Sequence, residues 1–131
     1  MTTVPKNVPL SESGENYLET ILELETSEGV AVRSVDVAAH MRVSRASVSK
    51  AMHALRDSGL VDFDPYGSVT LTGNGRRIAG EILERHEMLR RFLIQVLGVE
   101  ESVADAEACR MEHAIGRETK TRWMEYLRRI L

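Results

Sequence analysis

The sequence predicts a mostly α-helical protein with one small β-hairpin near its middle. Apolar residues recur at intervals of three and four along most of the 131 residues, which is typical of helices that bury one face. Between about 60 and 71, two short runs of alternating or β-branched residues instead flank the turn-forming segment 65–67. A membrane-spanning helix needs about 20 consecutive apolar residues, and the sequence contains no such run. We therefore expect a small helical protein without a membrane-spanning segment.

The first predicted helix runs from about residue 11 to residue 26. Its apolar positions, among them Leu18 and Ile21, follow helical spacing. The segment 1–29 is strongly acidic, because it contains six acidic residues and one basic residue, a net charge of −5. The helix is therefore expected to have one buried apolar face and one acidic face.

Two short helices are predicted next. The first runs from Ser34, which we expect to be its N-cap, to about Arg42. After Val43, a second helix is expected from the N-cap Ser44 to Gly59, a residue typical of helix ends. Two helices joined by about three residues favour a helix-turn-helix.

Two predicted strands, 60–64 and 68–71, follow this pair directly and form a hairpin in the position of a wing. The order of elements is typical of a winged helix-turn-helix, which binds DNA. Thr72 is expected to cap a long helix that ends near Gly98. The remaining expectations are shorter helices at 102–115 and 118–130, a winged helix-turn-helix domain at 1–73, and an all-helical domain at 74–131.

Charge is distributed unevenly along the chain. The whole chain carries −3, yet the segment 33–56 has five basic residues and one acidic residue, a net charge of +4. The first turns of the second helix of a helix-turn-helix enter the major groove. The candidate DNA contacts are therefore Ser44, Arg45, Ala46, Ser47, Ser49 and Lys50. Arg45 and Lys50 can reach bases or phosphates. The alternative is a helical domain whose basic face is only solvated.

A second group of residues is typical of a metal site. Cys109, Glu112 and His113 lie at positions i, i+3 and i+4 of one predicted helix, so a thiolate, a carboxylate and an imidazole share a face. Further candidate donors on other helices are Asn16, Glu19 and His86. Spacing alone leaves open the alternative of a structural cysteine beside two ordinary surface side chains.

Together these motifs resemble the diphtheria toxin repressor and manganese transport regulator family. The resemblance rests on Glu15–Ile21, Val48–Ser49, Gly59–Val61, Leu71–Gly75, Arg85–His86 and, most specifically, Glu107–His113. It implies a dimeric, metal-activated repressor of metal-uptake genes, with an N-terminal winged helix and a helical dimerisation domain. It also implies metal ligation by Glu19, His86, Cys109, Glu112 and His113, so that the ion would clamp the first helix to the dimerisation domain.

The sequence departs from the pattern of either family branch in three respects. Asn16 stands where the manganese branch has aspartate and the iron branch methionine, while Cys109 matches the iron branch and Glu19 the manganese branch. Arg90 stands where the iron branch has a glutamate. A thiolate favours softer ions, so Cys109 leans toward Fe²⁺, with Mn²⁺ the close alternative and Zn²⁺ or Co²⁺ as substitutes in vitro.

The sequence thus predicts a cytoplasmic protein, and the resemblance implies a homodimer that binds a palindromic double-stranded operator, uses a divalent metal and needs no organic cofactor. The alternative is a winged-helix regulator that senses a small organic ligand and has no metal requirement. An enzyme is disfavoured, because ferritin-like di-iron sites need a glutamate three residues before a histidine, and no histidine here has one. On the last helix, Trp123, Leu127 and Ile130 are expected to pack either a dimer or the domain's own core.

Overall fold

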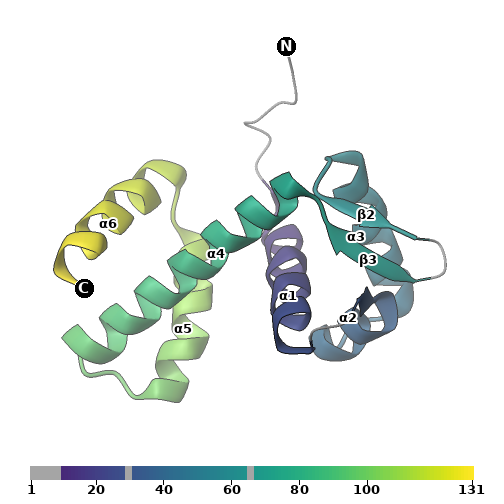
Figure 1. Ribbon diagram of the computed structural model, residues 1–131. Helices are drawn as coiled ribbons and strands as arrows, with labels where there is room; N and C mark the ends of the chain where they lie inside the picture. The colour runs from purple at the N-terminus through teal and green to yellow at the C-terminus, as the bar shows by residue number, and fades with distance from the viewer. Residues whose placement is uncertain (1–9, 29–30, 65–66) are drawn as a thin grey trace, which may run out of the picture. The chain divides into compact units, whose positions relative to one another are not determined.

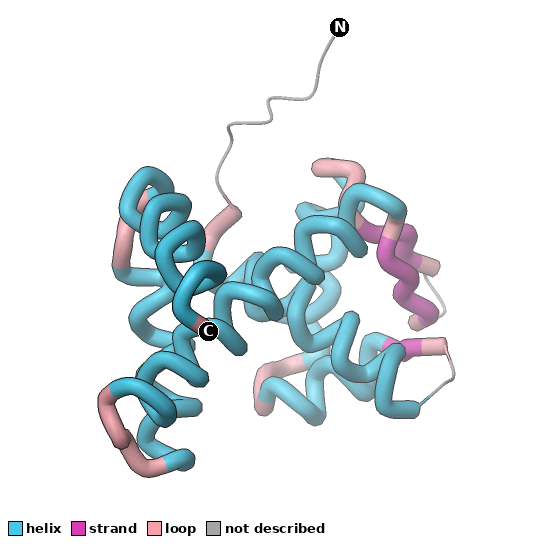
Figure 2. The backbone as a smooth tube through the Cα atoms, turned by 60° about the vertical axis from the view of Figure 1, so that its left-hand side comes forward, coloured by secondary structure: helices cyan, strands magenta, loops and turns pink. Residues whose placement is uncertain are grey.

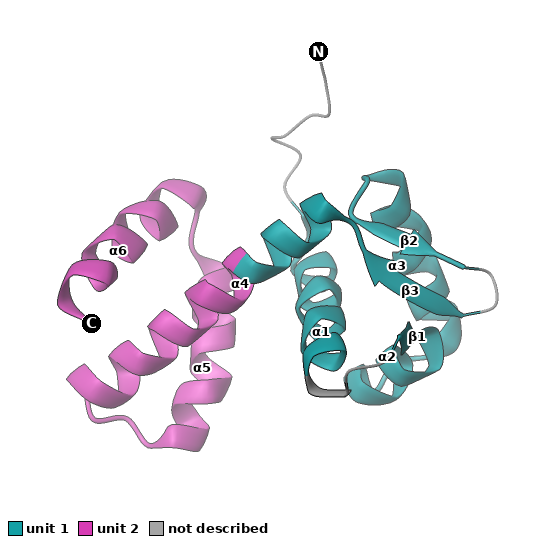
Figure 3. Ribbon diagram, in the orientation of Figure 1, with its two compact units in different colours: residues 1–80 teal, residues 81–131 magenta. Residues whose placement is uncertain are grey.

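The computed structural model of the chain describes residues 10–28, 31–64 and 67–131. The chain forms two compact units, Met1–Gly80 and Glu81–Leu131 (Figure 3). The elements are, in chain order, α1 (Glu12–Glu28), β1 (Val32–Arg33), α2 (Ser34–Met41), α3 (Arg45–Asp57), β2 (Val61–Phe63), β3 (Ser68–Leu71), α4 (Gly73–Arg91), the π-helix η1 (Phe92–Val96), α5 (Glu101–Ala114) and α6 (Arg117–Ile130). Helices dominate and a small antiparallel sheet lies in the first unit (Figure 2), which confirms the predicted fold class.

The helix-turn-helix forms where the spacing predicts it. Arg42 ends α2 in the left-handed conformation, with φ 58° and ψ 47°, and so turns the chain toward α3. Ser44 is the N-cap of α3, as predicted, and its Oγ accepts a hydrogen bond of 3.0 Å from the Ser47 amide. Beyond the C-cap Ser58, Gly59 takes a positive φ of 77°, which glycine adopts without strain.

The predicted cap of α2 is wrong by one residue. Arg33 is the N-cap, its side chain makes no capping hydrogen bond, and Ser34 is already helical. The cause lies in the sheet, because Arg33 is extended and pairs with Ser68, while the Ser34 amide donates to the carbonyl of Gly67 at 2.7 Å. The Ser34 hydroxyl oxygen is consequently buried without a hydrogen-bond partner among the described residues.

The sheet has three strands in the order β1-β3-β2, all antiparallel. Figure 1 shows β2 and β3 side by side as the predicted hairpin. In the register, Val61 pairs with Leu71 and Val32 with Val69, so the central strand β3 has neighbours on both sides. The strand β1 is a new finding, since two residues are too few to show a period in the sequence. The predicted turn residues Pro65 and Tyr66 lie outside the described residues.

The core of the first unit collects the apolar face of each of its elements. Leu18 and Ile21 of α1 are fully buried, as the spacing predicts. The other large side chains with less than 2% exposure in this unit are Val37, Val48, Met52, Val61 and Val69. The helix-turn-helix is therefore held from behind by α1 and by the sheet, which leaves the opposite side of α3 at the surface.

The start of α4 is fixed by hydrogen bonds to the segment that precedes β2. Thr72 caps the helix as predicted: its Oγ1 accepts from the Gly75 amide at 3.0 Å and donates to the Gly59 carbonyl at 2.7 Å. The Thr72 amide also donates to the Leu60 carbonyl at 3.1 Å. Gly75 lies so near the backbone of Leu60 that a Cβ at position 75 would be 1.9 Å from the Leu60 carbonyl oxygen. Only glycine fits this approach.

The second unit packs the later part of α4, η1, α5 and α6 around one apolar cluster. Its buried members are Met88, Leu89, Leu93, Ala104, Ala108, Met124 and Leu127. The predicted long helix widens into a π-helix at Phe92 before it ends. Leu127 thus belongs to the unit's own core, whereas Ile130 is 44% exposed. Within the described ranges, every helix is too short or too polar to cross a lipid bilayer.

Candidate functional site

The most unusual side chain of the second unit is the carboxylate of Glu112 on α5. It is 0% exposed, and within the described part of the chain neither carboxylate oxygen has a hydrogen-bond partner. Burying an ionised carboxylate is costly unless hydrogen bonds or an opposite charge compensate it. Because the described residues give Glu112 no hydrogen bond, a nearby positive charge must offset the cost of burying its carboxylate.

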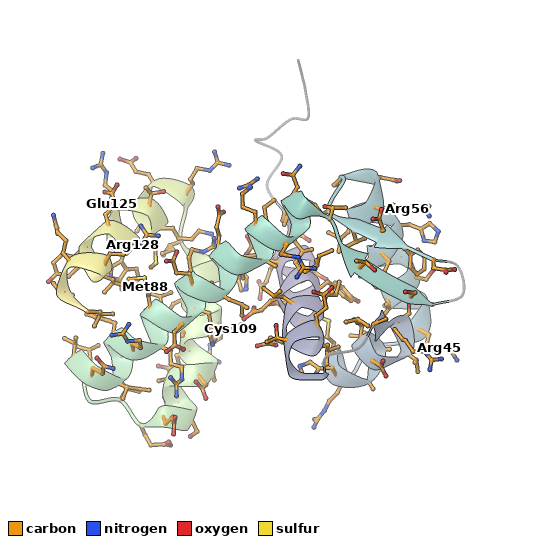
Figure 4. The ribbon with its side chains drawn as sticks, viewed as in Figure 1. Arg45, Arg56, Met88, Cys109, Glu125 and Arg128 are labelled. Carbon is orange, nitrogen blue, oxygen red and sulfur yellow. The ribbon has the colours of Figure 1, made fainter. Side chains whose placement is uncertain are left out.

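Three metal-binding side chains of α5 converge at this position. Cys109, Glu112 and His113 offer ligand atoms that all lie within 4.8 Å of one another. The i, i+3 and i+4 spacing brings them to one face of α5. Cys109, the first of the three, is labelled in Figure 4. Glu112 is fully buried, while Cys109 and His113 are partly buried, so the group is shielded without being sealed.

A fourth donor comes from α4. His86 Nδ1 lies 3.7 Å from Glu112 Oε1, and His113 Nε2 lies 3.9 Å from the same oxygen. These distances are too long for hydrogen bonds and leave room between the donors. The imidazoles of His86 and His113 thus both lie near the Glu112 carboxylate, one from α4 and one from α5.

This donor set fits a divalent transition metal. Imidazole nitrogen, carboxylate oxygen and thiolate sulfur are the usual protein ligands of Fe²⁺, Zn²⁺ and Co²⁺, and Mn²⁺ shares the nitrogen and oxygen donors. A cation would also give the buried oxygens of Glu112 the direct partner that they lack among the described residues. The residues present therefore fit the metal, by their chemistry and by the unsatisfied carboxylate.

The other two predicted ligands lie in the first unit. Asn16 and Glu19 are one helical turn apart on α1, and both side chains are partly buried. The structure thus brings together His86, Cys109, Glu112 and His113, and it places Asn16 and Glu19 on a helix of the other unit. Ligation by these two residues stays a prediction.

Sequence reasoning missed one residue of this site, Arg85. Its Nε lies 3.7 Å from Glu112 Oε2, and its side chain is 17% exposed. The signal was present in the sequence, because Arg85 precedes His86. However, adjacent residues of a helix usually point in different directions, so only the structure shows that both approach Glu112.

Arg90, the third departure from the family pattern, joins α4 to α5. Its Nε donates to Asp105 Oδ1 at 2.5 Å, a second nitrogen pairs with Glu101, and Glu87 lies 3.6 Å away. The hydrogen bond with Asp105 raises the pKa of Arg90 above its usual value. A permanent positive charge therefore occupies the centre of these three carboxylates.

The predicted DNA contacts lie on the first turns of α3 and at its N-cap. Ser44, Arg45, Ala46, Ser47 and Lys50 are exposed and Ser49 is partly buried, while Val48, Met52 and Leu55 on the opposite face are buried. Arg45 and Arg56 mark the two ends of the helix in Figure 4. Ser44 also uses its hydroxyl for the cap of α3. The exposed face carries small and basic side chains, which suits a helix that enters the major groove.

Comparison with known proteins supports both parts of this description. The family profile "Iron dependent repressor, N-terminal DNA binding domain" matches residues 9–69. The profile "Iron dependent repressor, metal binding and dimerisation domain" matches residues 72–130. Together the two profiles cover nearly the whole chain.

Individual proteins that resemble this chain belong to the same family as the two profiles. The transcriptional regulator MntR of Escherichia coli O6:H1 is 39% identical over 105 residues, which are 80% of this chain and 66% of MntR. The diphtheria toxin repressor of Corynebacterium glutamicum is 32% identical over 118 residues, which are 90% of this chain and 51% of that protein. The solved structure of a manganese-dependent transcriptional repressor in complex with manganese has a TM-score of 0.75 and 31% identity over 87% of this chain and 52% of its own. The chain spans about half to two thirds of the length of these relatives, and it belongs to the iron-dependent repressor family, which includes the diphtheria toxin repressor and MntR.

Proposed function

We propose that this protein is a metal-activated transcriptional repressor that binds operator DNA as a homodimer when a divalent cation is bound in its second unit. The observation that carries the proposal is the carboxylate of Glu112, which is fully buried, has no hydrogen bond to a described residue and lies near donors from His86, Cys109 and His113. A buried charge of this kind is unfavourable for stability alone, and such groups are concentrated at functional sites.

Four residues of the second unit would hold the cation: His86 from α4 and Cys109, Glu112 and His113 from α5. When bound, the cation supplies a compact positive charge opposite the carboxylate. The chain's own part is to hold the two histidines 3.7 and 3.9 Å from Glu112 Oε1 and to exclude water from the carboxylate. The ligands then link α4 to α5.

The physiological ion in this proposal is Fe²⁺ or Mn²⁺. The thiol of Cys109 favours Fe²⁺, and the nitrogen and oxygen donors serve either ion. The genes repressed would be those of metal uptake. Ligation by Asn16 and Glu19 is a separate proposal, because these residues lie in the first unit.

On the DNA side, we propose that the exposed face of α3 enters the major groove, with Arg45 and Lys50 as its basic contacts. A homodimer presents two such helices, so the operator is expected to be a pseudo-palindrome with half-sites about one helical turn apart. In this proposal the metal-bound protein would favour the dimer geometry that fits both half-sites. The roles of 1–73 in DNA binding and of 74–131 in metal binding and dimerisation follow from this proposal.

The first test is a cobalt titration. Cys109 is the only cysteine, so a near-ultraviolet thiolate-to-cobalt band in the Co²⁺-loaded protein can come from this residue alone. We expect the band in the wild type and its loss in Cys109→Ser. The same variant should lose more affinity for Fe²⁺ and Zn²⁺ than for Mn²⁺, because sulfur contributes most to softer ions. Cys109→Glu should shift the preference toward Mn²⁺.

A structural cysteine gives a different pattern. Serine or glutamate at a partly buried position would then lower the melting temperature without changing the order of metal affinities. Cobalt-loaded protein that binds DNA but shows no thiolate band would refute ligation by Cys109, while ligation by His86, Glu112 and His113 would be tested by their own variants.

The second test measures DNA binding. A duplex selected from a random pool by the metal-loaded protein should be pseudo-palindromic and should bind only in the presence of the ion. Lys50→Ala and Arg45→Ala should each weaken binding and reduce the slope of log K against log salt by about one, because each removes one phosphate contact. Arg56→Ala, an exposed arginine at the other end of α3, is the matched control and should retain the wild-type slope.

Fluorescence anisotropy at several salt concentrations, with and without chelator, provides all these values. Equal affinity in excess chelator would contradict metal activation and would favour the alternative of an organic effector. A flat salt response in the wild type would contradict the proposed DNA contacts on α3.

A further inference from the structure

The two oxygens of the Glu112 carboxylate face different groups. Oε1 lies 3.7 Å from His86 Nδ1 and 3.9 Å from His113 Nε2, so it faces nitrogens that can coordinate a metal. Oε2 lies 3.7 Å from Arg85 Nε. The carboxylate is thus placed between a pair of metal donors and a guanidinium that has no lone pair for a metal.

Arg85 differs from the histidines because its charge is permanent. A guanidinium stays protonated at every physiological pH, whereas the imidazoles must be neutral to bind an ion. The side chain of Arg85 is 17% exposed and that of Glu112 is 0% exposed, so little water screens the attraction between them. Without a metal, Arg85 is the fixed positive charge nearest to the buried carboxylate among the described residues.

The same charge has the opposite effect on a metal ion. A cation held by Glu112 would bind a carboxylate whose charge Arg85 already neutralises in part, and the guanidinium would repel the cation as well. The residue that stabilises the metal-free site therefore weakens the metal-bound site. Both effects come from one ion pair between α4 and α5.

We propose that Arg85 is an affinity-setting residue: it compensates Glu112 in the metal-free protein and so fixes the metal concentration at which the site fills. This inference rests on the proposed metal site at Glu112. It assigns to the chain a built-in cation that competes with the effector ion. A regulator needs such a threshold, because an ion bound too tightly would keep it active at every metal concentration.

The test compares Arg85→Met with Arg85→Lys and with a matched control, Arg110→Met. Arg110 lies beside Cys109 on α5 and carries the same charge, but its side chain is 70% exposed and it pairs with Glu107. Two quantities are measured on the full chain: the affinity for Mn²⁺ by isothermal titration calorimetry, and the melting temperature with chelator and with saturating Mn²⁺.

We expect Arg85→Met to bind Mn²⁺ about tenfold more tightly, the order expected when one nearby unit charge is removed at the effective dielectric of a protein. Its melting temperature in chelator should fall and its metal-induced rise should grow. Arg85→Lys keeps the charge and should stay within about threefold of the wild-type affinity. Arg110→Met should match the wild type in both quantities.

The outcomes separate the two proposals. If the wild type binds Mn²⁺ and Arg85→Met binds it equally or more weakly, the role of Arg85 is overturned while the metal site stands. If the wild type binds none of Mn²⁺, Fe²⁺, Co²⁺ and Zn²⁺, the proposed function itself fails. If Arg85→Met does not fold, Arg85→Gln takes its place with the same expected tightening, and unchanged affinity in that variant overturns the inference.

Discussion

We expect Glu112→Gln to abolish the binding of divalent cations and, at the same time, to raise the stability of the metal-free protein. The substitution keeps the shape of the side chain and removes a buried charge whose oxygens make no hydrogen bond in the described structure. Affinity should fall about 100-fold or more, since a ligand that coordinates directly counts for at least as much as its supporting partners. The gain in stability should be about 1 kcal/mol, because the neutral amide costs less to bury than the ionised carboxylate.

The ion pair between Arg85 and Glu112 does not cancel the stability gain expected for Glu112→Gln. Arg85 Nε lies 3.7 Å from Glu112 Oε2, too far for a hydrogen bond, so the neutral amide breaks no direct hydrogen bond between the two side chains. Thermal unfolding in chelator and with saturating Mn²⁺ measures both effects: the variant should melt higher than the wild type in chelator and show no rise with Mn²⁺.

The matched control for Glu112 is Glu107→Gln on the same helix. Glu107 is 47% exposed and pairs with Arg110, so the loss of its charge should change neither metal affinity nor melting temperature appreciably. A Glu112→Gln protein that is less stable in chelator and still gains stability from Mn²⁺ would show that the carboxylate is structural.

Gly75→Ala should destabilise the protein by about 3 kcal/mol, although alanine is normally the better helix former. The added methyl carbon would lie 1.9 Å from the backbone oxygen of Leu60, which cannot move without the segment that joins α3 to β2. The shift would also strain the hydrogen bonds through which Thr72 holds Gly59 and Gly75. Urea unfolding followed by circular dichroism should show a lower midpoint.

Gly73→Ala provides the control at the first residue of the same helix. No atom of the described residues lies within 4 Å of a Cβ built there, so the substitution should be neutral or stabilise the protein by up to about 1 kcal/mol. Equal effects of the two substitutions would mean that the close approach to Leu60 does not persist in solution.

Local rules explain why so much of the fold could be predicted. Amphipathic spacing placed the helices, Ser44 and Thr72 marked helix starts because a hydroxyl there satisfies free backbone amides, and Gly59 marked a stop because it adopts a positive φ. The prediction failed at Ser34 and missed β1. In both cases the deciding hydrogen bonds come from β3 and Gly67, more than 30 positions along the chain, and sequence periodicity carries no such long-range information.

The candidate metal site could likewise be predicted only in part from the sequence. The sequence by itself determined that Cys109, Glu112 and His113 share one face of a helix, because that follows from 3.6 residues per turn. Only the tertiary structure decided that His86 meets them, that Glu112 is 0% exposed, and that Arg85 lies 3.7 Å from its second oxygen. Burial and electrostatic pairing depend on how α4 packs against α5, and that packing depends on the shapes of many apolar side chains together rather than on the spacing within either helix.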